Sequence, residues 1–330
     1  MPDEEQIVHA IVSQMAEFMR VHYAGGHWER AGNTKTYGVV RGELEILPGL
    51  PANLRHGLFA EPADYAAWVR FAGPGPLSPP DVDDNGILSI GVKVMGVQGP
   101  KLLDDEQFTQ DFTGISCPTF TTPDVVANLD LQRHLFDGTP LFYFAKHPLD
   151  GLMQGLYART NTSPLEVRYW SCTPYLLGEG QAIQFSFRPS SDRRSRIPSP
   201  IPDDYLRQAM ARTLAETDVW FDLQVQLQTD PHRMPIENAG VEWPERLSPY
   251  IIVGRLRIPP QRFDSPSQLA FADQLSFNPW HSLPAHRPLG NQNRARRTIY
   301  LELSRLRQTM NDRSHVEPTG DEFFDKDQAS

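Results

Sequence analysis

Arg296 and Tyr300 stand four residues apart in a stretch with helical periodicity, so their side chains would share one face of a helix. A tyrosine phenol ordinarily ionises near pH 10, and an arginine that donates a hydrogen bond to the phenolate oxygen favours the charged form. Ferric iron favours it further, because a phenolate is an iron ligand. The spacing is therefore compatible with Tyr300 as a metal ligand and Arg296 as its partner. An exposed surface helix would show the same short and common pattern.

The helix that would carry this pair is predicted over residues 294–310. Its apolar positions step by four, three and four residues, which is the period of one helical face; they are Ile299, Leu303, Leu306 and Met310. Arg307 lies seven residues after Tyr300, two turns along nearly the same face. A guanidinium there could bind a carboxylate of a bound cofactor.

The rest of the chain indicates an α+β protein built on one large antiparallel sheet or barrel. Apolar spacing predicts an amphipathic helix over residues 4–22. Residues from about 35 to 260 contain short apolar runs separated by glycine and proline, a texture typical of strands and turns, with a further helix starting at about 204. Residues 1–311 are therefore expected to form a single domain. The polar residues 312–330 are expected to be a disordered tail.

Composition excludes several classes of function. The chain has a net charge of −10 and a pI of about 5.5, whereas a nucleic-acid partner requires a concentrated basic surface. No stretch approaches the roughly 20 apolar residues of a membrane span, so integral membrane association is not expected. The acidic amino terminus does not resemble a signal peptide, and two cysteines are too few for a disulfide framework. A cytoplasmic location is expected.

Several short motifs occur in the order found in one known family. They are Arg30 to Gly38 (RAGNTKTYG), Val69 to Ala72 (VRFA), Gly114 to Phe120 (GISCPTF), Trp243-Pro244 followed by Ile252 to Arg255 (IVGR), and Pro288-Leu289-Gly290 before the last helix. Together they resemble the catalase superfamily, specifically its small single-domain, catalase-related branch. The resemblance covers about residues 28–310. It implies a closed antiparallel barrel of about eight strands, peripheral helices and a carboxyl-terminal proximal helix.

The same resemblance implies one haem b group. By position, Tyr300 corresponds to the axial iron ligand with Arg296 beside it, and the arginines that match propionate-binding positions are Arg30, Arg70 and Arg307. Guanidinium groups are suited to this role because two carboxylates in a deep pocket need partners that offset their desolvation.

The distal side departs from the family pattern. Asn33 occupies the position of the distal histidine, Ile115 that of the distal asparagine, and Ala72 that of a serine. An amide can hold a peroxide oxygen but cannot serve as a general base, which typically contributes about a hundredfold to ten-thousandfold. The resemblance therefore favours an oxidoreductase acting on an organic or lipid hydroperoxide, as a peroxidase or a hydroperoxide lyase or isomerase, rather than an efficient catalase.

Three alternatives stay open at this point. The protein could be a non-catalytic haem-binding or haem-sensing protein, or its haem site could be vestigial. It could also be a true catalase or peroxidase if the register is slipped and another histidine, such as His27 or His56, supplies the base. Association into a homo-oligomer is compatible with the sequence, which fixes no number of subunits.

Overall fold

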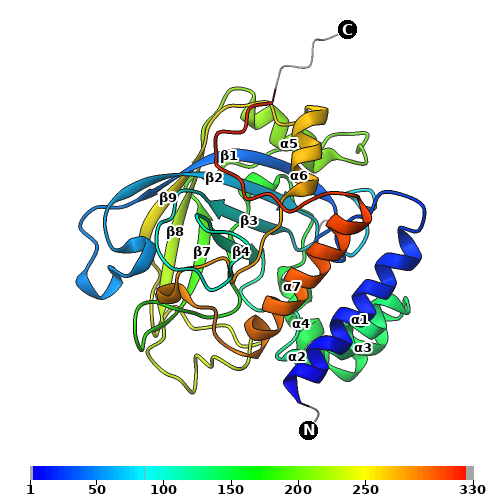
Figure 1. Cartoon of the computed structure of the whole chain (residues 1–330), viewed down its shortest axis with the longest axis horizontal. Coiled ribbons are helices and arrows are strands. Elements are labelled where there is room, and N and C mark those ends of the chain that lie inside the picture. Colours follow the sequence, from blue (N-terminus) through cyan, green and yellow to red (C-terminus); the bar gives the residue numbers. More distant parts are fainter. Residues whose placement is uncertain (1–2, 85, 325–330) are drawn as a thin grey trace.

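The computed structural model describes residues 3–84 and 86–324 and contains one antiparallel sheet of nine strands (Figure 1). The sheet order is β5-β4-β3-β2-β1-β9-β8-β7-β6, and an additional pairing of β5 with β7 closes eight strands into a barrel. The short strand β6 lies outside the closure, so the expected eight-stranded barrel is confirmed. The strands are β1 (Thr36–Ile46), β2 (Ala63–Ala72), β3 (Ser89–Val94), β4 (Gln110–Ile115), β5 (Tyr169–Trp170), β6 (Tyr175–Leu176), β7 (Ala182–Pro189), β8 (Val219–Leu227) and β9 (Ile251–Ile258).

Alternation along the strands separates an apolar interior from an outer face that also carries polar side chains. Val69 and Phe71 of β2 point into the main core inside the barrel, whereas Trp68 and Arg70 face outward, because successive strand residues point to opposite faces. Burial of each large apolar side chain contributes about 1.5–3 kcal/mol. The interior is therefore packed with side chains, and a cofactor site must be sought on the outer face.

Helices cover that outer face on one side of the barrel (Figure 1). They are α1 (Glu4–His22), α2 (Val125–Phe136), α3 (Pro140–Lys146), α4 (Pro148–Tyr157), α5 (Tyr205–Leu214), α6 (Pro266–Gln274) and α7 (Asn291–Met310). α1 spans the same residues as the helix predicted from apolar periodicity, and α7 begins three residues earlier than predicted. The two helices pack together through a second core that includes Ile11, Met19, Ile299 and Leu303. None of the described helices is long and apolar enough to cross a membrane.

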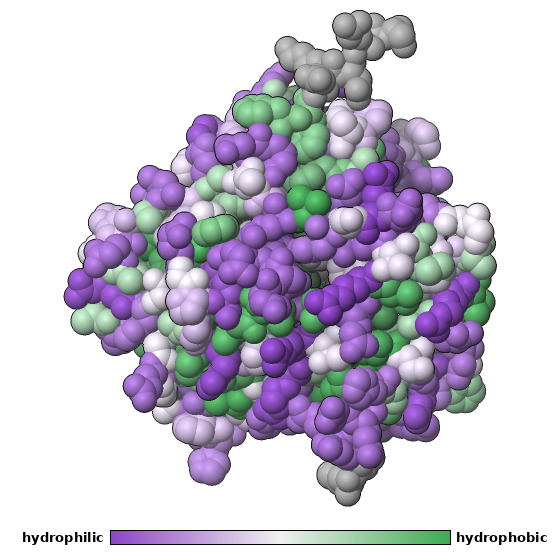
Figure 2. All heavy atoms as spheres, in the orientation of Figure 1, coloured by the Kyte–Doolittle hydropathy of each residue, from purple (hydrophilic) through white to green (hydrophobic). Residues whose placement is uncertain are grey.

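Two segments differ from the sequence-based expectation. Residues 125–157, expected to belong to a long section of strands, form α2, α3 and α4 instead. The predicted disordered tail is wrong for residues 313–324, which run across the protein: Glu317 accepts hydrogen bonds from the backbone of Gln107 and Phe108, and Glu322 accepts one from the Trp68 indole. Residues 325–330 lie outside the described part. Figure 2 shows a largely hydrophilic face with apolar residues interspersed.

Candidate cofactor site

Arg296 and Tyr300 meet on the inner side of α7 as their spacing predicted. Arg296 Nε donates to the Tyr300 hydroxyl at 3.2 Å, and the guanidinium also donates to Asn293 Oδ1 at 3.0 Å and to Thr113 Oγ1 of β4 at 2.6 Å. Burial acts to lower the pKa of Arg296, but the nearby Tyr300 and Tyr175 phenols outweigh it and raise the pKa above its ordinary value. The arginine is therefore held in its charged form against Tyr300.

Sheet register places two of the expected distal residues, Ala72 and Ile115, in one row. Ala72 of β2 pairs with Ser89 of β3, and Ser89 pairs with Ile115 of β4. Asn33 lies three residues before β1 at the same end of the sheet, with a positive φ of 47°, a conformation that asparagine adopts more readily than most residues. The backbone carbonyl of Asn33 accepts a hydrogen bond from Arg70. Ser89 lies between Ala72 and Ile115 and adds a hydroxyl group to this row. The sequence analysis did not identify it as a site residue.

The three arginines expected to bind carboxylates gather where β2, the segment before β1 and the end of α7 meet. Arg70 donates to the carbonyl oxygen of Asn33 at 2.7 Å and to Thr36 Oγ1 at 2.8 Å. Arg30 and Arg307 donate to one shared carbonyl oxygen, that of Leu275, at 2.5 and 3.1 Å. Neutral oxygens are thus the acceptors for all three guanidinium groups.

Electrostatics shows that this arginine cluster is short of negative charge. Burial lowers the pKa of Arg70, and repulsion from Arg30 and Arg307 lowers it further; burial followed by repulsion from Arg30 lowers that of Arg307. Within residues 3–84 and 86–324, none of the three arginines forms an ion pair. Asp273 and Glu29 act on the cluster electrostatically, but neither forms an ion pair with the three guanidinium groups, and the Asp273 carboxylate pairs with His27 at 3.1 Å. Buried cations of this kind are costly unless an anion joins them, so the cluster fits the two propionates of a haem.

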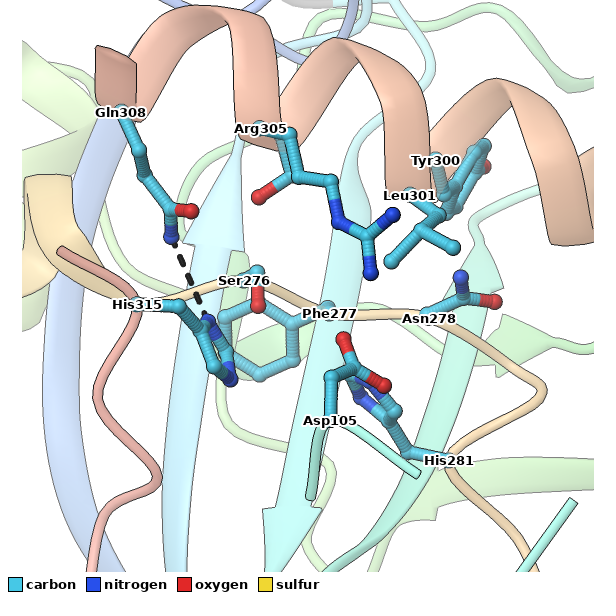
Figure 3. A pocket seen from close by; sticks show the side chains of 11 residues that line it. Asp105, Ser276, Phe277, Asn278, His281, Tyr300, Leu301, Arg305, Gln308 and His315 are labelled. Carbon is cyan, nitrogen blue, oxygen red and sulfur yellow. Dashed lines mark hydrogen bonds and ion pairs between the residues drawn. The ribbon is translucent and has the colours of Figure 1, made fainter. Parts of the chain in front are cut away.

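A cavity of about 120 Å³ lies beside Tyr300. In Figure 3, Arg305 and Leu301 project from α7 toward the loop of residues 276–278, Tyr300 lies beside the helix, and Asp105 and His281 lie on the other side of the loop. Asn33 and Ile115 are not among the lining residues. Ligand pockets usually enclose about 300–1,000 Å³, so this space is smaller than a porphyrin needs.

Phe277 lies between the cavity and the outer face of β3. Its ring lies so close to the outer face of β3 that a Cβ on Gly91 would come within 2.9 Å of it. The contact between Arg296 and Thr113 draws α7 onto the same sheet face. Tyr300 and the three arginines are therefore suited to bind the iron and the propionates of a haem. The space between α7 and the sheet is too small for a porphyrin, and Phe277 would have to move to widen it.

A buried ionic cluster borders this cavity. Lys93 of β3 forms an ion pair with Glu106 and another with Asp111 of β4 at 2.8 Å, and His281 bridges Asp111 at 2.8 Å and Asp105 at 3.2 Å. Glu106, Asp111 and His281 lie close enough together to hold a metal ion, but the Lys93 ammonium already occupies the position of a cation between the two carboxylates. The cluster joins the sheet to the loop that precedes α7.

The charge state of His281 follows from its two acidic partners. Burial and the charge of Lys93 act to lower its pKa, but hydrogen bonds to Asp105 and Asp111 outweigh them and raise the pKa from 6.5 to about 9. The imidazole is therefore protonated at neutral pH. His286, five residues later, is also buried, but there burial dominates and lowers the pKa to about 4. Both histidines pack within the loop, and only one of them carries charge.

Sequence comparison identifies no relative: no known family profile and no curated protein matches the chain. Solved structures do match. A fungal catalase aligns with a TM-score of 0.68 at 16% identity, covering 86% of this chain and 60% of its own. A bacterial catalase gives 0.67 at 16%, covering 93% and 65%, and catalase A from Saccharomyces cerevisiae gives 0.70 at 14%, covering 91% and 66%. The chain thus spans about 60–66% of the length of these catalases, and its fold is catalase-like.

Proposed function

We propose that the protein is a haem-dependent oxidoreductase that binds haem b through Tyr300. The observation that carries the proposal is the cluster of Arg30, Arg70 and Arg307, of which Arg70 and Arg307 are buried and Arg30 is half-buried. None of the three forms an ion pair with a carboxylate among the described residues. Arg307 lies on the same helix as Tyr300. A haem matches this arrangement, because its iron can bind Tyr300 while its two carboxylates bind the arginines.

The residues at the end of the sheet favour an organic substrate. Bound haem iron would supply the redox chemistry that activates an O–O bond. The Asn33 amide can donate a hydrogen bond to a hydroperoxide oxygen but cannot accept its proton near neutral pH. Ala72 and Ile115, which lie in the row across β2, β3 and β4, present a methyl and a larger alkyl group. We infer that an alkyl or lipid hydroperoxide is turned over faster than hydrogen peroxide.

Haem binding is tested first, with purified protein and hemin. We expect a Soret band at about one haem per chain, a stoichiometry set by a single tyrosine ligand. The Tyr300→Phe variant, which keeps the ring but loses the ligand oxygen, should retain little haem. Protein that stays colourless and takes up no added hemin would refute the proposal, and unchanged spectra in the variant would assign the iron to another residue.

Substrate preference is tested with the haem-loaded protein. Hydrogen peroxide, a small alkyl hydroperoxide and a fatty-acid hydroperoxide are compared in the wild type and in Asn33→His. We expect slow release of oxygen from hydrogen peroxide, faster turnover of the organic oxidants, and a gain on hydrogen peroxide in the variant. Rapid native catalase activity would contradict the distal role of Asn33. Haem-loaded protein that turns over none of the three would instead have a binding or sensing role.

A further inference from the structure

The segment that follows α7, residues 313–324, crosses the outer face of the sheet and passes close to α6 (Figure 1). We term these residues the carboxyl-terminal strap. Its first anchor lies just before β4, where Glu317 accepts hydrogen bonds from the backbone amides of Gln107 at 2.8 Å and Phe108 at 2.5 Å. One carboxylate thus fixes the middle of the strap to the body of the protein.

Beyond this anchor the strap packs on β2 and α6. Glu322 accepts a hydrogen bond from the Trp68 indole at 2.8 Å. The ring centroid of Phe324 lies 5.8 Å from that of Trp68 and 5.2 Å from that of Phe271. Phe324 and Phe277 pack against the same small apolar cluster, which includes Trp68. The strap is therefore part of the packing that holds Phe277 in place.

The strap also forms part of the wall of the cavity beside Tyr300. In Figure 3, His315 reaches this cavity and is joined to Gln308 of α7, whose Nε2 donates to His315 Nδ1 at 3.4 Å. His315 Nε2 lies 3.4 Å from Glu106 Oε1 of the buried ionic cluster. Phe277 lines the same cavity, so the strap borders the space around this ring at a second point.

Few bonds hold the strap to the protein. No backbone-to-backbone hydrogen bond joins residues 314–324 to the rest of the described chain, whereas such bonds connect the strands of the barrel. Val316 is 62% exposed and Phe323 is 87% exposed. A segment held by a few side-chain contacts opens at a lower free energy than the core of the same protein. The strap can therefore open while the barrel stays folded.

The strap lies where Phe277 would have to go when a haem binds. Toward β3 the ring has no room, since a Cβ on Gly91 would come within 2.9 Å of it. The cavity beside Tyr300 offers no solution, because a porphyrin needs that space as well. The remaining direction leads toward His315 and Phe324 of the strap. A closed strap and a bound haem therefore exclude each other.

We propose that the carboxyl-terminal strap is an autoinhibitory closure, which holds Phe277 against β3 in the haem-free protein and must open before a haem binds between α7 and the sheet. The identity of the ligand rests on the proposed function, whereas opening of the strap and its coupling to Phe277 do not depend on haem. A binding-competent state that is only partly populated weakens the apparent affinity by its fraction. The contacts of the strap thus set how tightly the ligand binds.

The first test is a hemin titration of the whole protein followed by absorbance. Glu317→Ala removes the acceptor for Gln107 and Phe108 and should tighten hemin binding by about tenfold or more, because two hydrogen bonds to a carboxylate together favour closure by at least that factor. Asp321→Ala is the matched control. It removes one carboxylate from the same strap, and this exposed side chain takes no part in the anchoring contacts, so its hemin affinity should equal that of the wild type.

The second test measures closure without haem. Hydrogen exchange at the backbone amides of Gln107 and Phe108 reports whether the strap is closed, because Glu317 is their acceptor. Glu322→Ala leaves these two bonds in place but removes the anchor on β2, so exchange at both amides should accelerate about fivefold or more if the strap opens as one unit. Phe277→Ala should accelerate it too, since coupling between two sites is reciprocal. Saturation of the wild type with hemin should have the same effect.

Four results would each overturn the strap and leave the proposed function in place: equal hemin affinity in the wild type and Glu317→Ala, an equal gain in Asp321→Ala, unchanged exchange in Glu322→Ala, or unchanged exchange in the haem-loaded wild type. Failure of the proposed function looks different. In that case neither the wild type nor Glu317→Ala takes up hemin, while exchange still accelerates in Glu322→Ala and Phe277→Ala. That result would support the strap as a closure and show that its ligand is not haem.

Discussion

Stability at alkaline pH should depend on one buried histidine, His281. Its pKa is raised from 6.5 to about 9 by Asp105 and Asp111. A group whose folded pKa is raised contributes its full stability below the unfolded value and loses it as the pH rises through the folded value. The His281 contribution is therefore complete below about pH 6.5 and lost by about pH 10.

The size of that loss follows from the two pKa values. A tenfold difference in proton affinity corresponds to about 1.4 kcal/mol, so a rise from 6.5 to about 9 corresponds to about 3 kcal/mol in the free energy of unfolding. Solvent screening is weak here because the His281 side chain is 2% exposed. Such a loss is a large part of the 5–15 kcal/mol that stabilises a typical protein.

Urea unfolding at intervals from about pH 6 to pH 10 measures this contribution. The His281→Asn variant should be less stable than the wild type near neutral pH and should converge on it near pH 10. The control is His286→Asn: the pKa of His286 is lowered to about 4 by burial, so this histidine is neutral in both states above pH 7. Its variant should differ from the wild type by a constant amount over the alkaline range. Parallel stability curves for the wild type and His281→Asn would refute a charged His281.

Three further predictions concern the cofactor site. Phe277→Ala removes the ring that lies against Gly91. It should lower apo-protein stability by about 2 kcal/mol, less than the roughly 3–5 kcal/mol for a fully buried phenylalanine, because Phe277 is half-buried. It should also tighten hemin binding in an absorbance titration, and weaker binding would contradict the need for Phe277 to move. Arg70→Met should weaken hemin retention by about 2 kcal/mol or more, because a bound carboxylate loses a buried partner; unchanged retention would remove Arg70 from the site. Arg296→Leu should leave haem bound but shift its charge-transfer bands, a milder effect than that of Tyr300→Phe, and identical spectra would show that the hydrogen bond to Tyr300 is unimportant.

Elements whose apolar residues face a core were predictable from the sequence. Ile299 and Leu303 repeat at helical spacing because they pack against α1, so the last helix was located to within three residues. α4 was not predicted although its leucines also repeat at helical spacing, because each of α3 and α4 begins with a proline, a residue that is common in turns. Proline at the first position of a helix is in fact favourable.

The candidate site was predictable only in part, since its contacts depend on strand register. The Arg296 and Tyr300 pair follows from local spacing, but its bond to Thr113 depends on how β4 meets α7. Lys93, Asp111 and His281 come together from two strands and a distant loop. The carboxyl-terminal segment is polar, and it is ordered by a few specific bonds, such as that of Glu322 to Trp68, that composition does not reveal.

The way the barrel closes has a consequence for folding kinetics. β1 to β4 form one antiparallel meander and β7 to β9 another, and the two are joined by the pairing of β1 with β9 and by the short strand β5. The β1–β9 seam pairs Glu43 with Arg257, more than 200 residues along the chain, whereas the β5–β7 seam pairs Tyr169 with Phe187. Loop closure makes such distant contacts slow to form. During synthesis the first meander must therefore wait, with the β1 edge unpaired, until β9 has left the ribosome, and this interval is when the chain is most exposed to aggregation.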